Sequence, residues 1–201
     1  MLSDHDYFET ILKAAFSSVS GITVYRNKES VFNYLYLKHE DGQYIGRCQI
    51  IAGEKGVNIF DVNINFPKKG IGRKITKAAA LWAEALGKTS MTAVHVNEEG
   101  LMAWPRLGAL PSADALERLS LACVSVSNYV AQNEREKLKT INLMAHDDNK
   151  SAWYAMTDKS NPSLYLDTNT LQFIGLELYN YQDLTFDIMH PSVRQRLGLD
   201  L

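Results

Sequence analysis

The most chemically informative stretch of the sequence runs from Phe66 to Lys77. It contains no acidic residue and five basic residues, which are Lys68, Lys69, Arg73, Lys74 and Lys77. Gly70 and Gly72 lie among them, and glycine lets backbone N–H groups approach a ligand closely. The first N–H groups of a helix have no partner within the helix, so a glycine loop that opens a helix favours an anion. The segment therefore predicts a phosphate-binding loop.

The charges of this segment oppose the helix that follows it. Apolar spacing predicts a helix over 73–86, which places Arg73 and Lys74 in its first turn. Positive charge there opposes the helix dipole at a cost of roughly 0.3–1 kcal/mol per residue, and a bound anion would reverse that cost. The alternative is a plain glycine turn with solvated lysines, and the residues alone leave both open. Neither the P-loop pattern nor G-x-G-x-x-G is present.

The elements that position this loop follow from hydrophobic periodicity. A helix and four strands are predicted over 3–17, 22–26, 31–39, 44–51 and 57–66. Asp41-Gly42 is a hairpin signal between two of these strands, and consecutive hairpins predict an antiparallel meander. The last strand alternates in polarity: one face would carry Phe60, Val62, Ile64 and Phe66, and the other Asp61, Asn63 and Asn65.

Further elements are predicted after the helix over 73–86. They are a strand, two helical stretches, two strands and a short helix, over 89–96, 98–107, 112–139, 171–179, 184–189 and 192–197. Ser112 is placed to cap the second helical stretch. Residues 145–162 are polar and fit no single pattern.

The order of strand, Pro67-Lys68-Lys69-Gly70-Ile71-Gly72-Arg73, helix and strand resembles the core of the GCN5-related N-acetyltransferases. The cofactor loop of that family reads [QR]-x-x-G-x-[GA], and Gly70 and Gly72 match its glycines. A later family segment reads N-x-x-A-x-x-x-Y-x-x-x-G-[FA]. The same spacing here holds Asn97, Gly100, Trp104, Gly108 and Ala109. The resemblance covers residues 22–109.

Three residues depart from the family pattern. Pro67 replaces Gln or Arg, Gly100 replaces Ala, and Trp104 replaces Tyr. In the family, that tyrosine often protonates the leaving thiolate of coenzyme A, whereas an indole N–H only donates hydrogen bonds. Water or another group would then be the acid, or the protein binds the cofactor without turnover. For Trp104 we favour the interpretation of a core aromatic on a helix.

The resemblance implies a mixed α+β fold with a mostly antiparallel, twisted sheet flanked by helices. One domain would span residues 1–201, with its core over about 20–110 and 163–190. A helical insertion over 111–162 would precede the last strands, which would close the sheet. The insertion would cover the acceptor side of the site or bind a partner.

The resemblance also implies a site for acetyl-CoA between the strands over 57–66 and 89–96. The pantetheine arm would pair with backbone, and the pyrophosphate would bind N–H groups from Gly70 to Ile75. The expected cofactor-binding residues are Val62, Asn63, Ile64, Lys68, Lys69, Gly70, Ile71, Gly72, Arg73, Lys74, Ile75 and Asn97.

Acyl transfer to an amine needs a deprotonated nucleophile, and two residues are candidate bases. They are Asp61, on the polar face of its strand, and His95, because histidine titrates near neutrality. The alternative for His95 is a half-buried strand residue bonded to a backbone carbonyl. Asn97 stands where a helix cap belongs.

The leading prediction is an acetyl-CoA-dependent N-acetyltransferase whose amine acceptor is a small molecule or a protein. One alternative is a catalytically inactive binding or assembly module of the same fold, which Trp104 and Pro67 favour. A further alternative is a binder of nucleotides or nucleic acid that uses the basic segment over 68–77.

Composition limits the partners. The net charge is −2, from 21 Lys+Arg and 23 Asp+Glu, whereas non-specific nucleic-acid binders are usually clearly basic. No metal-ligand spacing is present, so no metal is expected. The sequence shows neither a basic, apolar leader nor an apolar run of about 18 residues, so we expect a cytoplasmic protein outside the membrane. Cys48 and Cys123 are expected to be buried, reduced thiols, and the oligomeric state stays open.

Overall fold

The computed structural model describes residues 4–19, 21–27, 33–65, 70–94, 98–178 and 183–200. They form a mixed α+β fold with a mostly antiparallel sheet, which confirms the predicted fold class. The chain divides into two compact units, Met1–Val94 with Asp187–Leu201, and His95–Phe186. The sequence predicts one domain with an insertion over 111–162, and the second unit extends beyond both ends of that range.

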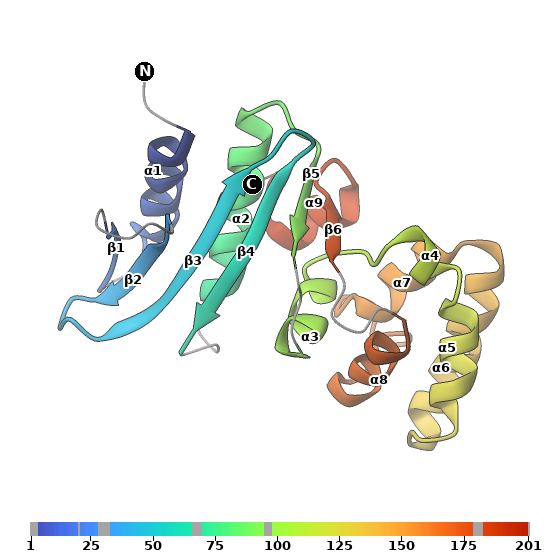
Figure 1. The fold of residues 1–201 in the computed structure, drawn as a ribbon. Helices are drawn as coiled ribbons and strands as arrows, with labels where there is room; N and C mark the ends of the chain where they lie inside the picture. The colour runs from blue at the N-terminus through green and yellow to red at the C-terminus, as the bar shows by residue number, and fades with distance from the viewer. Residues whose placement is uncertain are drawn as a thin grey trace. The chain divides into compact units, whose positions relative to one another are not determined.

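The first unit contains most of the sheet (Figure 1). Its described helices are α1 (Asp4–Phe16), α2 (Ile71–Ala85) and α9 (Pro191–Leu197). Its strands are β1 (Ile22–Arg26), β2 (Leu35–His39), β3 (Tyr44–Ala52), β4 (Val57–Ile64) and β5 (Ser90–Ala93). Strands β1 to β4 pair antiparallel in chain order, as the hairpin signals predict, and β5 pairs parallel with β4. A parallel pair needs a crossover, which α2 supplies.

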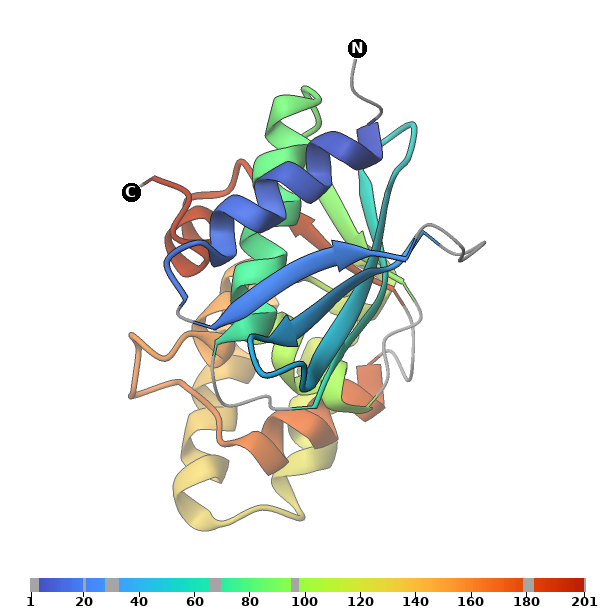
Figure 2. The same ribbon diagram turned by 90° about the vertical axis from the view of Figure 1, so that its left-hand side faces the viewer.

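Helices α1 and α2 lie on one face of this sheet (Figures 1 and 2). Phe8 of α1 stacks on Trp82 of α2 with ring centroids 4.9 Å apart, and both side chains are buried. Burying a large apolar side chain contributes roughly 1.5–3 kcal/mol. Ile75 and Ala79 continue the buried stripe of α2 at helical spacing. The predicted helix is therefore confirmed and begins at Ile71.

The opposite face of the sheet, called the outer face below, carries polar and aromatic side chains. The strand register sets Tyr25 opposite Tyr36 and Tyr36 opposite Arg47. Directly opposed residues point to the same side of a sheet, so these three share the outer face. No described helix of the first unit covers this face (Figure 2).

A bulge interrupts the pairing of β3 with β4. Gln49 is opposite Asp61, but Ile50 is opposite Ile59, so Phe60 has no opposite residue. An extra residue of this kind changes the side to which the following side chains point. Phe60 is 45% exposed, so the prediction that it shares the apolar face with Val62 is wrong.

The second unit is mainly helical. Its described helices are α3 (Glu98–Arg106), α4 (Ala113–Leu116), α5 (Leu119–Ser127), α6 (Gln132–Asp147), α7 (Asn149–Thr157) and α8 (Thr168–Leu178). The helical stretch predicted over 112–139 is divided among α4, α5 and α6. Ser112 caps α4 as predicted, because its Oγ accepts a hydrogen bond from the N–H of Ala115 at 3.3 Å.

The strand predicted over 171–179 is wrong, because this segment belongs to α8. The carboxylate of Asp167 accepts a hydrogen bond from the N–H of Thr170 at 2.7 Å and so starts the helix. Leu171, Ile174 and Leu178 are buried at helical spacing. Phe173 is apolar although it is exposed, so the helical spacing of the buried residues cannot be recognised from the apolar residues of the sequence.

One described strand, β6 (Leu184–Asp187), follows α8 and ends where the chain re-enters the first unit. Within the second unit, Leu110 and Thr185 exchange two backbone hydrogen bonds of 2.8 Å. Within the first unit, the N–H of Ile188 donates to the carbonyl oxygen of Thr89 at 3.0 Å.

Candidate functional site

The N-terminal end of α2 is the first part of the candidate site. Gly70 precedes the helix with φ 67° and ψ 13°, a left-handed conformation that glycine adopts without strain. Gly70 has no side chain with which to cap the helix, and no described side chain bonds its first N–H groups. Ile71 is buried and holds the first turn against the unit, while Gly70 is exposed. Among the described residues, the helix therefore begins at the surface without a side-chain cap.

Helical hydrogen bonding begins at Lys74, whose N–H donates to the carbonyl oxygen of Gly70 at 3.1 Å. The N–H groups of Ile71, Gly72 and Arg73 come before that bond and have no acceptor within the helix. The sequence predicts an anion site on N–H groups from Gly70 to Ile75. The N–H of Lys74 already bonds within the helix, and that of Ile75 follows it. The N–H groups that remain available to an anion are therefore those of the first turn.

Gly72 is a glycine that the fold does not require. Its φ is outside the positive range, and an added Cβ would meet no described atom within 4 Å. Glycine inside a helix is less stable than alanine by roughly 0.5–1 kcal/mol. Gly70, by contrast, needs glycine for its backbone angle. The position of Gly72 therefore keeps open space directly beside the uncapped N–H groups.

The cations of the basic segment have different roles. Lys74 donates from Nζ to the carbonyl oxygen of Ala15 at 3.3 Å, and so binds the C-terminal end of α1. Lys77 donates from Nζ to the carbonyl oxygen of Gly198. Arg73 is exposed, and within the described part of the chain its guanidinium has no hydrogen-bond partner. Two of the three described cations thus hold the unit together. The predicted residues Lys68 and Lys69 lie outside the described residues.

Strands β4 and β5 form the second part of the candidate site. Their pairing runs from Val57 opposite Met91 to Ile59 opposite Ala93, and the N–H of Val94 donates to the carbonyl oxygen of Ile59 at 2.9 Å. Strand β4 continues to Ile64.

In that continuation, Val62, Asn63 and Ile64 pair with β3 on one side. On the other side no described residue pairs with them. Within the described part of the chain, these three predicted residues therefore form a strand edge with its backbone groups unpaired on that side. The predicted residues His95 and Asn97 lie outside the described residues.

Asp61 lies beside this edge, on the outer face. Its Oδ2 accepts a hydrogen bond from Nε of Arg47 at 2.8 Å, and the two side chains are 26% and 40% exposed. That hydrogen bond raises the pKa of Arg47. The guanidinium of Arg47 also lies over the ring of Tyr34, 4.7 Å from its centroid. The candidate base is therefore one half of an ion pair on an aromatic surface.

Four tyrosines extend this surface over β1, β2 and β3. Tyr36 is at the centre, with ring centroids 5.4 Å from Tyr25, 6.1 Å from Tyr34 and 6.5 Å from Tyr44. Burial raises the pKa of Tyr44, the neighbouring charge of Arg47 lowers it, and the net effect is a raised value.

Arg47 and these tyrosines were not predicted from the sequence. The alternation of Tyr34 and Tyr36 in the segment over 31–39 is the signal that indicates a shared face.

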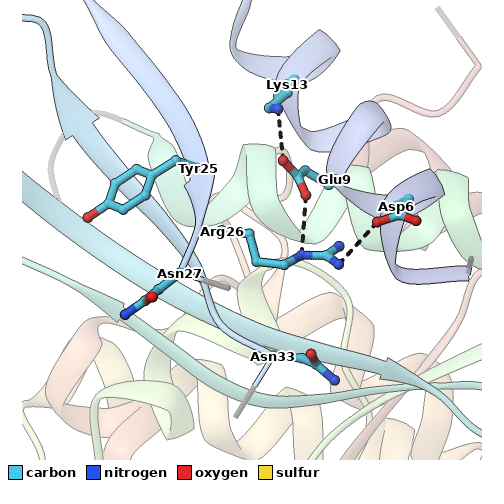
Figure 3. Close-up of a pocket in the computed structure, with 7 residues that line it drawn as sticks. All are labelled: Asp6, Glu9, Lys13, Tyr25, Arg26, Asn27 and Asn33. Carbon is cyan, nitrogen blue, oxygen red and sulfur yellow. Dashed lines mark hydrogen bonds and ion pairs between the residues drawn. The ribbon is translucent and has the colours of Figure 1, made fainter. Parts of the chain in front are cut away.

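A cavity of about 450 Å³ lies elsewhere in the first unit (Figure 3). It is lined by Asp6, Glu9, Lys13, Tyr25, Arg26, Asn27 and Asn33. Arg26 contacts Asp6 at 3.1 Å and Glu9 at 3.2 Å, and Lys13 contacts Glu9 at 2.8 Å. Its acidic and basic groups pair with each other, and the ion pairs tie α1 to β1. None of the predicted site residues lines this cavity.

Trp104 and the cysteines occupy structural positions. The ring of Trp104 meets that of the fully buried Phe186 edge-on at 6.0 Å, but Trp104 itself is only half-buried, so it packs at the margin of the core rather than within it. Cys48 and Cys123 are free and buried, as predicted. Burial raises the pKa of each thiol to about 12, which makes both weak nucleophiles near neutral pH.

No group of three or more His, Cys, Asp or Glu side chains is arranged to hold a metal ion within the described residues. None of the described helices has the length and apolar character that crossing a membrane requires.

Comparison with protein-family models, with curated proteins and with solved structures finds no match to this chain.

Proposed function

We propose that the first unit binds acetyl-CoA at the N-terminal end of α2 and along the edge of β4, and transfers the acetyl group to an amine. The observation that carries this proposal is Gly72. Neither its backbone conformation nor any described neighbour calls for glycine, and alanine would make the helix more stable. A phosphate group close to the backbone supplies the missing reason.

The pyrophosphate would be held by the N–H groups of Ile71, Gly72 and Arg73. These groups lie at the positive end of the helix dipole, and no side chain of the described residues competes for them. Arg73 adds a charged donor beside them, and Lys68 and Lys69 precede them in the chain. Lys74 and Lys77 act through packing, because their amino groups bond backbone carbonyls of the unit.

The pantetheine arm would lie against β4 where its pairing with β5 has ended. An amide-containing chain binds a strand edge by the same backbone hydrogen bonds that join two strands. Val62, Asn63 and Ile64 supply that edge, and the first turn of α2 follows them in the chain. One strand and one helix end then bind the two parts of one ligand.

Transfer of the acetyl group requires an uncharged amine aligned with the thioester carbonyl. The amine attacks the carbonyl carbon, the carbon–sulfur bond breaks, and the amine loses a proton. Within the first unit, Asp61 is the proposed acceptor of that proton, and water protonates the leaving thiolate of coenzyme A. At Asp61, Oδ2 is engaged by Arg47, while no described residue donates to Oδ1. The proton would therefore go to Oδ1.

The second candidate function is binding of the coenzyme without turnover. Trp104 favours it, because a ring that packs edge-on against buried Phe186 has a structural role at the position where the family has its acid. In this case the loop still binds the pyrophosphate and the strand edge still binds the pantetheine arm, but no acetyl group is transferred.

Calorimetry with acetyl-CoA tests coenzyme binding directly. The unaltered chain should bind, and Gly72→Glu should weaken binding by about tenfold or more, because the new carboxylate repels phosphate. The matched control is Ala85→Glu, which adds the same charge at an exposed position at the other end of α2. Equal affinity of Gly72→Glu and Ala85→Glu would refute the loop assignment.

A thiol-release assay separates the two candidate functions. Release of coenzyme A that depends on an added amine supports the transferase. Binding of acetyl-CoA with no thiol release across amino acids, peptides, polyamines and aminoglycosides supports the inactive module.

A further inference from the structure

Arg47 is held in place on two sides of the outer face. Its Nε donates to Asp61, and its guanidinium carbon lies over the ring of Tyr34, 4.7 Å from the centroid. These two contacts hold the guanidinium and leave Nη1 and Nη2, which have no hydrogen-bond partner within the described residues. The side chain is 40% exposed, so these two atoms are reachable by a ligand.

A fixed guanidinium with open terminal nitrogens matches a carboxylate. The planar fork of arginine forms two parallel hydrogen bonds to the two oxygens of a carboxylate, and a guanidinium that is already oriented loses little entropy when it binds. Tyr44 lies on the same face, with its ring centroid 6.5 Å from that of Tyr36, and its phenol O–H is a further donor on this face.

The charge of the outer face points to the same ligand. Lys38 lies over the ring of Tyr25 at 4.8 Å and adds a second cation. The carboxylate of the cluster, Asp61, is already paired with Arg47. A polycationic amine would meet two like charges here, whereas an amine that also carries a carboxylate would meet a complementary charge.

We propose that Arg47 binds a carboxylate of the acceptor, so that the acceptor is an amino acid or an acidic peptide rather than a polyamine. This inference rests on the proposed function. Asp61 adjoins Val62, which belongs to the strand edge proposed for the pantetheine arm. A carboxylate held by Arg47 places an amine a few bonds away beside that edge. Arg47 is then a specificity-determining residue, and Asp61 orients it.

Binding is tested without turnover by following the Nε–H signal of Arg47 by NMR in the full chain. The first probe is an equimolar mixture of free amino acids, the second is the mixture of their carboxamides, and the third is a tri-glutamate peptide. We expect the free amino acids or the peptide to shift the signal, and the carboxamides to leave it unchanged. A shift with the peptide alone identifies the acceptor as a polypeptide. No shift with either acid, or equal shifts with acids and amides, overturns the proposal.

Variants make the assignment specific to the guanidinium. Arg47→Gln should weaken binding of the responding acid by about 10- to 100-fold, and Arg47→Lys should restore only part of it, because an ammonium lacks the fork. For these variants binding is followed through ligand signals, and circular dichroism verifies the fold. Lys55→Gln is the control, because it removes an exposed cation of the same unit in the turn between β3 and β4, and it should change affinity by about twofold or less. An equal loss in Lys55→Gln and Arg47→Gln would show general charge attraction and overturn the role of Arg47.

Failure of this inference and failure of the proposed function are distinguishable. Calorimetry with acetyl-CoA reports on the loop at Gly72, and the Arg47 signal reports on the acceptor. Coenzyme binding without a carboxylate response refutes only the inference. A carboxylate response without coenzyme binding refutes the proposed function and leaves Arg47 as a carboxylate-binding residue.

Discussion

The Nζ of Lys74 donates a hydrogen bond to the carbonyl oxygen of Ala15 at 3.3 Å, so a lysine from the basic segment holds the last turn of α1. Lysine near a helix C-terminus satisfies a carbonyl that has no partner in the helix and interacts favourably with the dipole. This contact separates the roles of neighbouring cations. Lys74 stabilises the unit, while Arg73 remains available for a ligand.

The first prediction compares these two neighbours. Lys74→Met should lower the free energy of unfolding by roughly 0.5–1.5 kcal/mol, the usual contribution of one hydrogen bond. Arg73→Met should leave stability nearly unchanged and should weaken acetyl-CoA binding more than Lys74→Met does. Urea unfolding and calorimetry measure the two quantities. A larger loss of affinity in Lys74→Met would return Lys74 to the phosphate site.

Gly72→Ala should have opposite effects on stability and binding. The added methyl meets no described atom, so the free energy of unfolding should rise by up to about 1 kcal/mol. The same methyl occupies the space proposed for phosphate, so affinity for acetyl-CoA should fall. Gly70→Ala is the comparison, and it should destabilise by about 1–2 kcal/mol because φ there is 67°. A stabilised Gly72→Ala with full affinity would contradict the proposed function.

Gly46 is predicted to be irreplaceable for a steric reason. A Cβ added there would overlap the backbone carbonyl oxygen of Asn63 and come within 2.9 Å of Cδ1 of Ile64. Gly46→Ala should therefore destabilise by about 1–3 kcal/mol and disturb the edge of β4. Urea unfolding gives the first effect, and amide chemical shifts of β4 give the second. Unchanged stability would mean that β3 and β4 lie further apart at this point.

In the second unit, the buried carboxylate of Glu134 is predicted to stabilise the fold through its hydrogen bonds. It accepts hydrogen bonds from the N–H of Asp167 at 2.9 Å and from Nζ of Lys137 at 2.7 Å, and its side chain is 2% exposed. Glu134→Ala leaves the N–H of Asp167 without this acceptor and leaves the ammonium of Lys137 only the carbonyl oxygen of Tyr165, so it should cost about 1–3 kcal/mol in unfolding free energy. Exposed Glu136→Ala is the control and should cost less than about 1 kcal/mol. Equal effects would mean that the network contributes nothing to stability.

The buried thiol of Cys48 predicts a loss of stability at alkaline pH. Its pKa is raised from 9.0 to about 12 in the folded chain, so the unfolded chain releases its proton first. The protonated thiol makes its full contribution to the free energy of unfolding below about pH 9. Above that pH the free energy of unfolding falls by about 1.4 kcal/mol per pH unit. Urea unfolding at about pH 8 and about pH 10.5 should show a smaller decrease for Cys48→Ala than for the unaltered chain. Equal decreases would mean that the folded thiol ionises normally.

Local sequence signals predicted much of the first unit. The hairpins over β2 to β4 follow from turn residues and alternation, and α2 follows from its apolar stripe. Features set by distant partners were not predictable in this way. The bulge at Phe60 depends on how β4 meets β3, and the bond from Lys74 to Ala15 depends on the packing of α1 on α2.

The second unit shows where periodicity fails. In α8 the exposed residues Phe173 and Leu176 are apolar like the buried ones, so helix and strand patterns look alike. The deciding signal was the cap at Asp167, a residue type that also occurs in turns. For the candidate site, the sequence indicated the loop and Asp61. The pairing of Asp61 with Arg47 appeared only when β3 and β4 were aligned.

The central claim is that the first turn of α2 binds phosphate groups of coenzyme A. Its most direct test is an NMR titration of the full chain with acetyl-CoA, followed at the backbone amides of α2. The account predicts large shifts for Ile71, Gly72 and Arg73, and small shifts toward the C-terminal end of the helix. Shifts elsewhere in the chain without any change in these three amides, or no shifts at all, would contradict it.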